Sequence, residues 1–315
     1  MRVLFMGTGE IGLPSFRLLL ERSDCEVVAA VTQPDKPAGR KQELQASPIK
    51  QAALGAGVAV LQPTKLRAPD SLTEITALRP DLIVVMAYGQ ILPKAVLDAP
   101  RIACLNLHAS ILPRHRGAAP IQAAMEAGDH CTGITVMYMA EGLDTGDILL
   151  IRETPIRRRD TAGVLHDRLG VIAAEALSAA LPLLVAGNAP RIPQDDARAT
   201  YAAKLSRENG LIDWAASPAA IDRRIRAMNP WPAAYTWLPT SDGPRKLKVF
   251  SCIQHRRDSG AAGEVLRADR RGILVGAGSG AVLLRDIQLE GKRRMPARDF
   301  LLGHAVEQGT GLGYP

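Results

Sequence analysis

An amide and an imidazole two positions apart are the residues with the clearest capacity for chemistry in this sequence. Asn106 and His108 lie in the stretch "CLNLHASILPRHRGAAP", where Leu105 and Leu107 alternate with them. Successive side chains of a strand point to opposite faces, so the two polar groups are predicted on one side and the leucines on the other. The strand would deliver the polar pair together at its carboxyl end.

A carboxylate follows in a glycine-bounded turn. The stretch "EGLDTGDIL" places Asp144 between Gly142 and Gly146, just before an apolar segment. Glycines permit a tight turn that can aim a carboxylate into a cleft, but Asp is also a common turn residue that caps its own backbone. Residue type alone favours an Asp144 that caps its own turn. The alternative is that its carboxylate lies beside His108.

These three side chains suit the transfer of an acyl group to an amine, because the amine is itself the nucleophile and no Ser or Cys is required. Asn106 can donate an N–H to the oxygen that becomes negative, and His108 can take the proton shed by the attacking ammonium. Asp144 would orient the imidazole and stabilise its cation. The remaining histidines are predicted as surface or helix residues: His115, His130, His166, His255 and His304.

The N-terminal stretch "VLFMGTGEIG" is a competing motif. Gly7, Gly9 and Gly12 fill the G-x-G-x-x-G pattern after an apolar strand, as in dinucleotide-binding enzymes. Such a site also needs an acidic residue at the end of the second strand, but here Asp35 arrives late and after a proline. We therefore favour a tight turn between strand and helix and expect no NAD.

The elements that must position these residues alternate between apolar strands and helices. Strands are predicted at Arg2–Met6, Val27–Thr32, Leu82–Met86, Ile102–Leu107, Gly133–Met139 and Ile148–Glu153. Helices are predicted near Ile11–Arg22, Pro48–Ala56, Ser71–Leu78, Pro93–Leu97 and Thr161–Val185. This order predicts an α/β fold with a Rossmann-like parallel sheet, which binds ligands at the carboxyl ends of its strands.

A second domain follows a change of pattern. We expect a catalytic domain over residues 1–188, a linker over 189–205 that is rich in Pro, Asp, Arg and Ala, and a second domain over 206–315. Short strands separated by turn residues predict a small OB-like β-barrel there: Tyr235–Leu238, Leu247–Ile253, Gly263–Leu266, Gly272–Val275 and Ala281–Leu289.

Composition narrows the class of protein. The 315 residues, 47% of them hydrophobic, are enough for two cores, and the four scattered cysteines show no metal-ligand spacing. The apolar stretch Val171 to Val185 includes Glu175 and Pro182 and is predicted as a core helix, so we expect a cytoplasmic protein with no membrane segment and no metal. Of the net charge of +7, six belong to residues 206–315, which indicates a polyanionic partner.

A family resemblance rests on several motifs beyond the candidate site. The chain resembles the folate-dependent formyltransferases, and within them the branch that acts on methionyl-tRNA, at "NLHASILPRHRGAAPIQ" and "GLDTGDIL". The resemblance extends to "TQPDKPAGR", "SPIK", "AYGQILPKAVL" and, in the second domain, "NPWPAAYTWL". Gly9 departs from the family pattern, in which a proline commonly follows the Gly-Thr pair.

The resemblance implies a reaction and assigns residues to it. The family's catalytic Asn, His and Asp correspond to Asn106, His108 and Asp144, the formyl donor would be 10-formyltetrahydrofolate, and the acceptor would be initiator methionyl-tRNA. Folate binding is implied for Ser110, Ile111, Leu112 and Pro113, with backbone groups around Met86–Ile91 completing the pocket.

The same resemblance implies contacts with the tRNA and a monomeric enzyme. Arg40 and Lys41, in the loop "PDKPAGRKQELQAS", would meet the acceptor end of the tRNA. The second domain would add phosphate contacts. Candidates for these are Arg245, Lys246, Lys248, Lys292, Arg293 and Arg294.

Three other functions remain open from the sequence. Folate-dependent formyl transfer to a small amine, a ribonucleotide or an amino sugar, uses the same chemistry, but the basic second domain argues against it. An NAD-dependent reductase rests on the glycine pattern alone. A nucleic-acid-binding module without catalysis would leave the Asn106 and His108 pair without a purpose.

Overall fold

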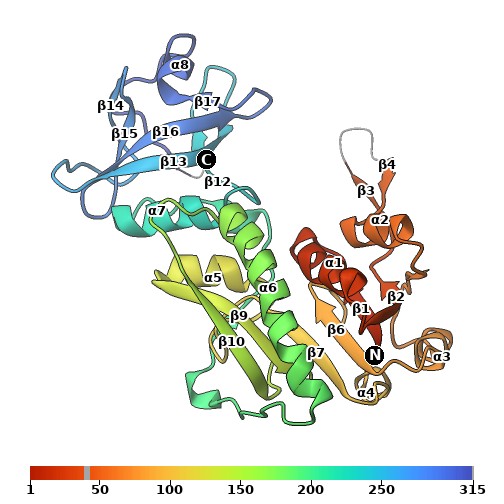
Figure 1. Ribbon diagram of the computed structural model, residues 1–315. Helices are drawn as coiled ribbons and strands as arrows, with labels where there is room; N and C mark the ends of the chain where they lie inside the picture. Colours follow the sequence, from red (N-terminus) through yellow and green to blue (C-terminus); the bar gives the residue numbers. More distant parts are fainter. Residues whose placement is uncertain (39–42, 314–315) are drawn as a thin grey trace. The chain divides into compact units, whose positions relative to one another are not determined.

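The chain forms two compact units in a computed structural model that describes residues 1–38 and 43–313 (Figure 1). The first unit contains residues 1–120, 131–155 and 166–202, and the second contains 121–130, 156–165 and 203–315. Two short segments of the predicted catalytic domain therefore group with the second unit, and most of the predicted linker groups with the first.

The first unit is built on a seven-stranded sheet (Figure 1). Its strands are β1 (Arg2–Gly7), β2 (Glu26–Val31), β5 (Val60–Leu61), β6 (Leu82–Met86), β7 (Ala103–His108), β9 (Cys131–Tyr138) and β10 (Ile148–Pro155). They pair in the order β10-β9-β7-β6-β1-β2-β5. The strands from β7 to β5 run parallel, which confirms the predicted Rossmann-like sheet, whereas β9 and β10 extend it antiparallel. Strand β6 is buried along its whole length, as expected for a strand covered on both faces.

Helices and short strands complete the first unit. These are η1 (Glu10–Gly12), α1 (Leu13–Glu21), α2 (Pro48–Gly55), α3 (Pro69–Ala77), α4 (Lys94–Leu97), η2 (Asp196–Arg198), the β3–β4 hairpin (Lys36–Ala38 with Glu43–Gln45) and the β8–β11 pair (Arg116–Gly117 with Tyr201–Ala202). Helix α2 begins where the sequence predicts, because Ser47 caps it by accepting the backbone N–H of Lys50 at 3.2 Å.

The glycine turn between β1 and η1 has a packing reason. A Cβ at Gly7 would lie 2.8 Å from the backbone oxygen of Met86, so a side chain there would collide with β6. At Gly9 the nearest atom to such a Cβ would be that of Ala87 at 3.8 Å, an ordinary contact. The third glycine of the pattern, Gly12, packs against Phe5. Close packing therefore explains why Gly7 and Gly12 lack a side chain, whereas a side chain at Gly9 would meet no close contact.

Helix α6 (Ala162–Val185) is a core helix. By length and composition alone it could cross a membrane. Side chains spaced three and four residues apart, including Leu165, Leu169, Ala173 and Leu177, are completely buried in the protein. A core helix was the prediction for the part from Val171 to Val185.

The second unit is built on a six-stranded antiparallel sheet. Its elements are α5 (Pro120–Ala127), η3 (Glu208–Gly210), α7 (Pro218–Ala227), β12 (Ala234–Leu238), β13 (Arg245–His255), β14 (Val265–Asp269), β15 (Gly272–Gly276), β16 (Ala281–Leu289), β17 (Met295–Pro296) and α8 (Ala297–Leu301). Four of the five predicted strands are confirmed, and the fifth, predicted at Gly263–Leu266, lies later in the chain at Val265–Asp269. The strands pair in the order β12-β13-β16-β15-β14, with β17 on β16.

The predicted closure of these strands into an OB-like barrel is not confirmed. In the described part of the chain β12 and β14 remain the two edges of the sheet, and no ladder joins them. The C-terminal residues Gly311 and Gly313 make single bridges to Glu264, beside β14, and to Trp237 of β12. Closure depends on which distant strands meet, and alternating residue patterns do not encode that choice.

Candidate active site

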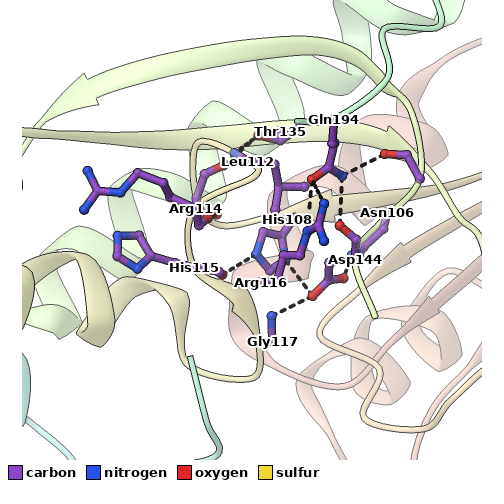
Figure 2. A network of polar contacts seen from close by, with 12 residues as sticks. Asn106, His108, Leu112, Arg114, His115, Arg116, Gly117, Thr135, Asp144 and Gln194 are labelled. Carbon is purple, nitrogen blue, oxygen red and sulfur yellow. Dashed lines mark hydrogen bonds and ion pairs between the residues drawn. The ribbon is translucent and has the colours of Figure 1, made fainter. Parts of the chain in front are cut away.

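Asn106 and His108 stand on β7, near its carboxyl end (Figure 2). Strand β7 is paired on both edges: Asn106 lies opposite Val85 of β6, and His108 lies opposite Thr135 of β9. A strand fixed on both sides holds its side chains in a defined position. His108 is buried and Asn106 is half-buried.

The carboxylate of Asp144 faces both side chains. Asn106 Nδ2 donates to Oδ1 at 3.3 Å, the backbone N–H of Gly117 donates to Oδ2 at 2.7 Å, and His108 Nδ1 lies 3.7 Å from Oδ2 (Figure 2). Asp144 itself has a left-handed φ of 52°, which short polar residues tolerate. Because the hydrogen-bonded partners are 38 and 27 residues away in the chain, the carboxylate does not cap its own turn. The three side chains do converge on one point.

The hydrogen bond at the other ring nitrogen fixes where His108 carries its proton. His108 Nε2 lies 2.9 Å from the backbone oxygen of His115. A carbonyl oxygen can only accept, so Nε2 holds the hydrogen and Nδ1 carries the lone pair of the neutral ring. Nδ1 is the atom that faces Asp144. A proton taken up at Nδ1 therefore becomes an N–H that faces the carboxylate of Asp144.

His115 is buried, and its prediction as a surface residue is wrong. Only 6% of the residue is exposed, although arginines flank it on both sides. Its backbone has a left-handed φ of 60°, and its N–H donates to Thr200 Oγ1 at 2.9 Å. The turn that contains His115 thus binds a segment 85 residues away, and neighbouring charges do not reveal such a contact.

Two supporting residues, Arg116 and Gln194, were missed in the sequence. The guanidinium of Arg116 is buried and donates to Gln194 Oε1 at 2.8 and 3.1 Å and to Asp196 Oδ1 at 2.7 Å. Gln194 Nε2 in turn donates to the backbone oxygens of Asp144 and Gly146, both at 2.8 Å (Figure 2). These bonds fasten the turn that carries Asp144.

No sequence signal singled out Gln194, because it lies in the aperiodic stretch predicted as a linker. That stretch does more than connect: besides Gln194 it supplies Thr200 to His115 and the β11 strand that pairs with Arg116 and Gly117. A position next to Pro193 and two aspartates resembles an exposed loop in composition. Its contacts exist only in the folded chain.

The predicted folate-binding residues form the turn directly after β7. Ser110 Oγ donates to the backbone oxygen of Arg114 at 2.7 Å, while Thr135 Oγ1 donates to the backbone oxygen of Ser110 and accepts the N–H of Leu112. Leu112 packs inward with Met137 and Ile148. The half-buried side chains of this turn are Ile111 and Pro113. Within 110–113, therefore, Ser110 and Leu112 hold the turn and the other two side chains reach solvent.

Two neighbouring loops present apolar side chains to solvent. Ile91 follows β6 and is 74% exposed, and Leu143 precedes Asp144 and is 59% exposed. An ion pair of 3.9 Å links Lys94, the first residue of α4, to Glu141 in the loop that contains Leu143. Exposed apolar groups beside buried polar ones are the usual lining of a small-molecule site.

Cys104 shares the face of β7 with Asn106 and His108 but is not available as a nucleophile. It is buried in an apolar cluster, and burial raises the pKa of its thiol to about 12. The thiol therefore stays protonated, and protonated thiols attack carbonyl carbons poorly. In the described part of the chain no group of His, Cys, Asp and Glu has the arrangement of a metal site.

The predicted tRNA-binding pair, Arg40 and Lys41, lies outside the described residues. Of the basic candidates in the second unit, Lys246 stands 4.2 Å from the ring centre of Tyr235, and Arg294 is paired with Asp286. Arg245 donates to the backbone oxygen of Glu290.

Comparison with protein-family models finds two matches along this chain. Residues 1–181 match the formyl transferase model, and residues 204–305 match the model of the formyl transferase C-terminal domain. The gap between the two matches coincides with the segment that supplies Gln194 and Thr200.

Curated relatives match along nearly the full length. A methionyl-tRNA formyltransferase of Geobacter sulfurreducens is 48% identical over 313 residues, which cover 99% of this chain and 97% of the relative. A methionyl-tRNA formyltransferase of Methylacidiphilum infernorum is also 48% identical, over 99% of this chain and 98% of the relative.

Solved structures share the fold at low identity. WlaRD, a sugar 3N-formyl transferase crystallised with dTDP and 5-N-formyl-THF, has a TM-score of 0.66 and 16% identity and covers 93% of this chain and 99% of its own. HypX from Aquifex aeolicus in complex with tetrahydrofolic acid has a TM-score of 0.62 and 19% identity, covering 100% of this chain and 51% of its own.

Proposed function

The chain belongs to the formyltransferase family, in the branch of the methionyl-tRNA formyltransferases, and we propose that Asn106, His108 and Asp144 carry its reaction. The enzyme transfers a formyl group from a folate-derived donor to the amino group of initiator methionyl-tRNA. The observation that supports this assignment of residues is the convergence of one amide, one imidazole and one carboxylate at the end of β7.

Asn106 has one donor to spare for the reacting oxygen. Its amide carries two N–H groups, and one of them is bound to Asp144 Oδ1. The second can donate to the formyl oxygen, which becomes negative as the amine nitrogen attacks the formyl carbon. Because the bond to Asp144 holds the amide before substrate arrives, this donor needs no reorientation during the reaction. Such a donor is typically worth a factor of about 100 to 1,000 in rate.

His108 and Asp144 handle the proton. The attacking amine must lose a proton as its bond to the formyl carbon forms, and the lone pair on His108 Nδ1 can receive it. Asp144 then faces the cationic ring at Nδ1, while the carbonyl of His115 keeps Nε2 in place. Cleavage of the bond between the formyl carbon and the folate nitrogen completes the transfer, and the proton passes to the departing nitrogen.

We propose 10-formyltetrahydrofolate as the donor and residues 110–113 as part of its site. The turn lies next to His108 and is held by Thr135, so its backbone is fixed where a pterin ring could bind. Ile111 and Pro113, with the exposed Ile91, offer apolar surface for the ring. Backbone groups around Met86–Ile91 would complete the pocket.

We propose Arg40 and Lys41 as contacts to the acceptor end of the tRNA, and the basic second unit as a platform for its phosphates. The net charge of +6 in residues 206–315 supports this platform. We also propose an OB-like description of this unit, supported by the C-terminal residues that bridge Trp237 of β12 and Glu264 beside β14. We also propose that the enzyme is a monomer in the cytoplasm and that the predicted domain limits hold.

Formyl transfer to a small amine is the second candidate, because WlaRD shares the fold and acts on a sugar. One experiment separates the two. The enzyme is incubated with labelled 10-formyltetrahydrofolate and either charged initiator tRNA, uncharged initiator tRNA or an amino sugar nucleotide. We expect label only on the charged tRNA, and label on the sugar alone would overturn the assignment.

The loop residues require a separate test. Arg40→Ala should lower kcat/KM for methionyl-tRNA, because a phosphate contact would be lost. The matched control is Arg67→Ala, which removes an exposed arginine of the first unit that belongs to neither proposed site. Equal values for the two variants would count against the loop assignment.

A further inference from the structure

The segment that follows β6 has a backbone conformation that its residues do not favour by themselves. Ala87 has a left-handed φ of 50°, and Gly89 has a φ of 89°. A left-handed φ brings the Cβ of an L-residue too close to a carbonyl oxygen, and alanine has no polar side chain that could offset this cost. Both residues are exposed, so burial of side chains does not hold them either. Neighbouring groups must therefore fix residues 87–90.

Thr8 supplies two of the hydrogen bonds that fix this segment. It directly follows β1, and its backbone N–H donates to the oxygen of Ala87 at 3.2 Å. Its hydroxyl donates to the backbone oxygen of Tyr88, also at 3.2 Å. The two bonds thus reach the left-handed residue and the residue after it.

The Thr8 hydroxyl has a fixed partner on its other side. It accepts the backbone N–H of Gln33 at 3.2 Å. The oxygen of Gln33 accepts from Gln62 Nε2 at 2.9 Å, and the Gln62 amide is also bonded to Asp35 and Lys50. A hydroxyl can donate and accept at the same time, so it is the group that this position needs.

Thr8 lies at the place where sheets of this kind bind ligands. Strand β1 pairs with β2 on one edge and with β6 on the other. The chain builds the parallel sheet outward from β1, first through β2 to β5 and then on the other side from β6 to β7. In open α/β sheets the ligand crevice lies at the carboxyl ends of the strands where the order reverses in this way. Thr8 and residues 87–90 follow the carboxyl ends of β1 and β6.

We propose that Thr8 is a positioning residue for the formyl donor: its hydroxyl holds residues 87–90 in the left-handed conformation that binds the pterin ring. This inference rests on the donor site proposed above, which includes backbone groups around Met86–Ile91. Thr8 itself stays away from the reacting atoms. When only a fraction of the molecules has the competent loop, the apparent affinity for the donor falls by that fraction, while the chemistry at Asn106 and His108 is unchanged.

The test is Thr8→Val, which keeps the shape of the side chain and the backbone N–H but removes the hydroxyl. A neutral hydrogen bond changes an equilibrium by up to about tenfold, so Kd for 5-formyltetrahydrofolate and KM for 10-formyltetrahydrofolate should rise by about five- to tenfold. At saturating donor, kcat should stay within about twofold of wild type, because binding alone is affected. KM for methionyl-tRNA should not change.

Three companion variants separate positioning from a general loss of stability. Thr8→Ser keeps the hydroxyl and should bind 5-formyltetrahydrofolate as wild type does. Ala87→Gly, added to Thr8→Val, should recover much of the lost affinity, because glycine adopts a positive φ without a Cβ penalty. The matched control is Thr76→Val in α3, which removes a hydroxyl that also donates to a backbone oxygen, that of Leu72 at 2.8 Å. This control should show the wild-type Kd.

A wild-type Kd in Thr8→Val would overturn the proposal, as would a lower kcat with an unchanged KM for the donor. Thermal unfolding checks that each variant folds. If Thr8→Val does not fold, Thr8→Ala removes the hydroxyl without placing a methyl group against the oxygen of Tyr88, and the same criteria apply to it. Wild-type protein that still formylates charged initiator tRNA leaves the proposed function standing when Thr8 fails the test. Wild-type protein without affinity for 5-formyltetrahydrofolate would overturn both proposals.

Discussion

Replacing Asp144 by Asn tests the whole site, because both oxygens of this carboxylate accept hydrogen bonds. Oδ1 accepts from Asn106 Nδ2 at 3.3 Å, and Oδ2 accepts from the backbone of Gly117 at 2.7 Å. An amide has one oxygen and one N–H₂ group. The Gly117 donor is fixed by the backbone, so the new oxygen stays there and the new N–H₂ group faces Asn106.

Asn106 must then turn its amide by half a rotation and present its own oxygen to residue 144. This rotation removes the N–H from the place where the formyl oxygen would bind, and the substitution removes the carboxylate charge that faces His108 Nδ1. Loss of one oxyanion donor costs about 100-fold or more, and loss of an oriented base adds a further factor. We expect kcat to fall by about 1,000-fold, which corresponds to roughly 4 kcal/mol at about 1.36 kcal/mol for each factor of ten.

The assay is single-turnover formylation of methionyl-tRNA by wild type, Asp144→Asn, Asn106→Ala and the double variant. Because Asp144→Asn already displaces the Asn106 donor, the double variant should lose far less than the product of the two single losses. Thermal unfolding serves as the control for folding. A loss below tenfold in Asp144→Asn, or fully multiplicative losses in the double variant, would refute the reasoning.

Three further outcomes follow from contacts outside the reacting groups. Gln194→Leu leaves the buried Arg116 guanidinium with one acceptor fewer, so urea unfolding should show that the free energy of unfolding falls by about 1–3 kcal/mol. We also expect a lower kcat, because Gln194 holds the turn that contains Asp144. An unchanged kcat would show that this support does not matter for the reaction. Hydrogen bonds from Lys50 and Gln62 lower the pKa of Asp35, so this carboxylate stabilises the fold above its ordinary pKa and the contribution fades as pH falls through the lowered value. Lys50→Met should therefore be less stable than wild type near pH 7, and urea unfolding should show a narrower difference near pH 3. Cys104, with a pKa raised to about 12 by burial, should resist alkylation in the folded protein and react once it is unfolded, as followed by mass spectrometry.

The local residue pattern is enough to predict the strand that contains Asn106 and His108. Alternation along β7 predicts that Asn106 and His108 share a face, because that depends only on the two-residue period of a strand. The alternation of apolar runs and helices likewise predicts the parallel sheet. The glycines around Asp144 predict a tight turn at the right place.

Only the tertiary structure determines which groups contact the turn that contains Asp144. Residue type alone favoured a carboxylate of Asp144 that caps its own backbone, and only the folded chain brings it to Asn106, Gly117 and His108. The same holds for the bonds from Gln194 and for the open edges of the second sheet. Periodicity and turn propensity act over a few residues, whereas these contacts join segments tens of residues apart. Their geometry is set by the packing of the complete chain, which no short stretch contains.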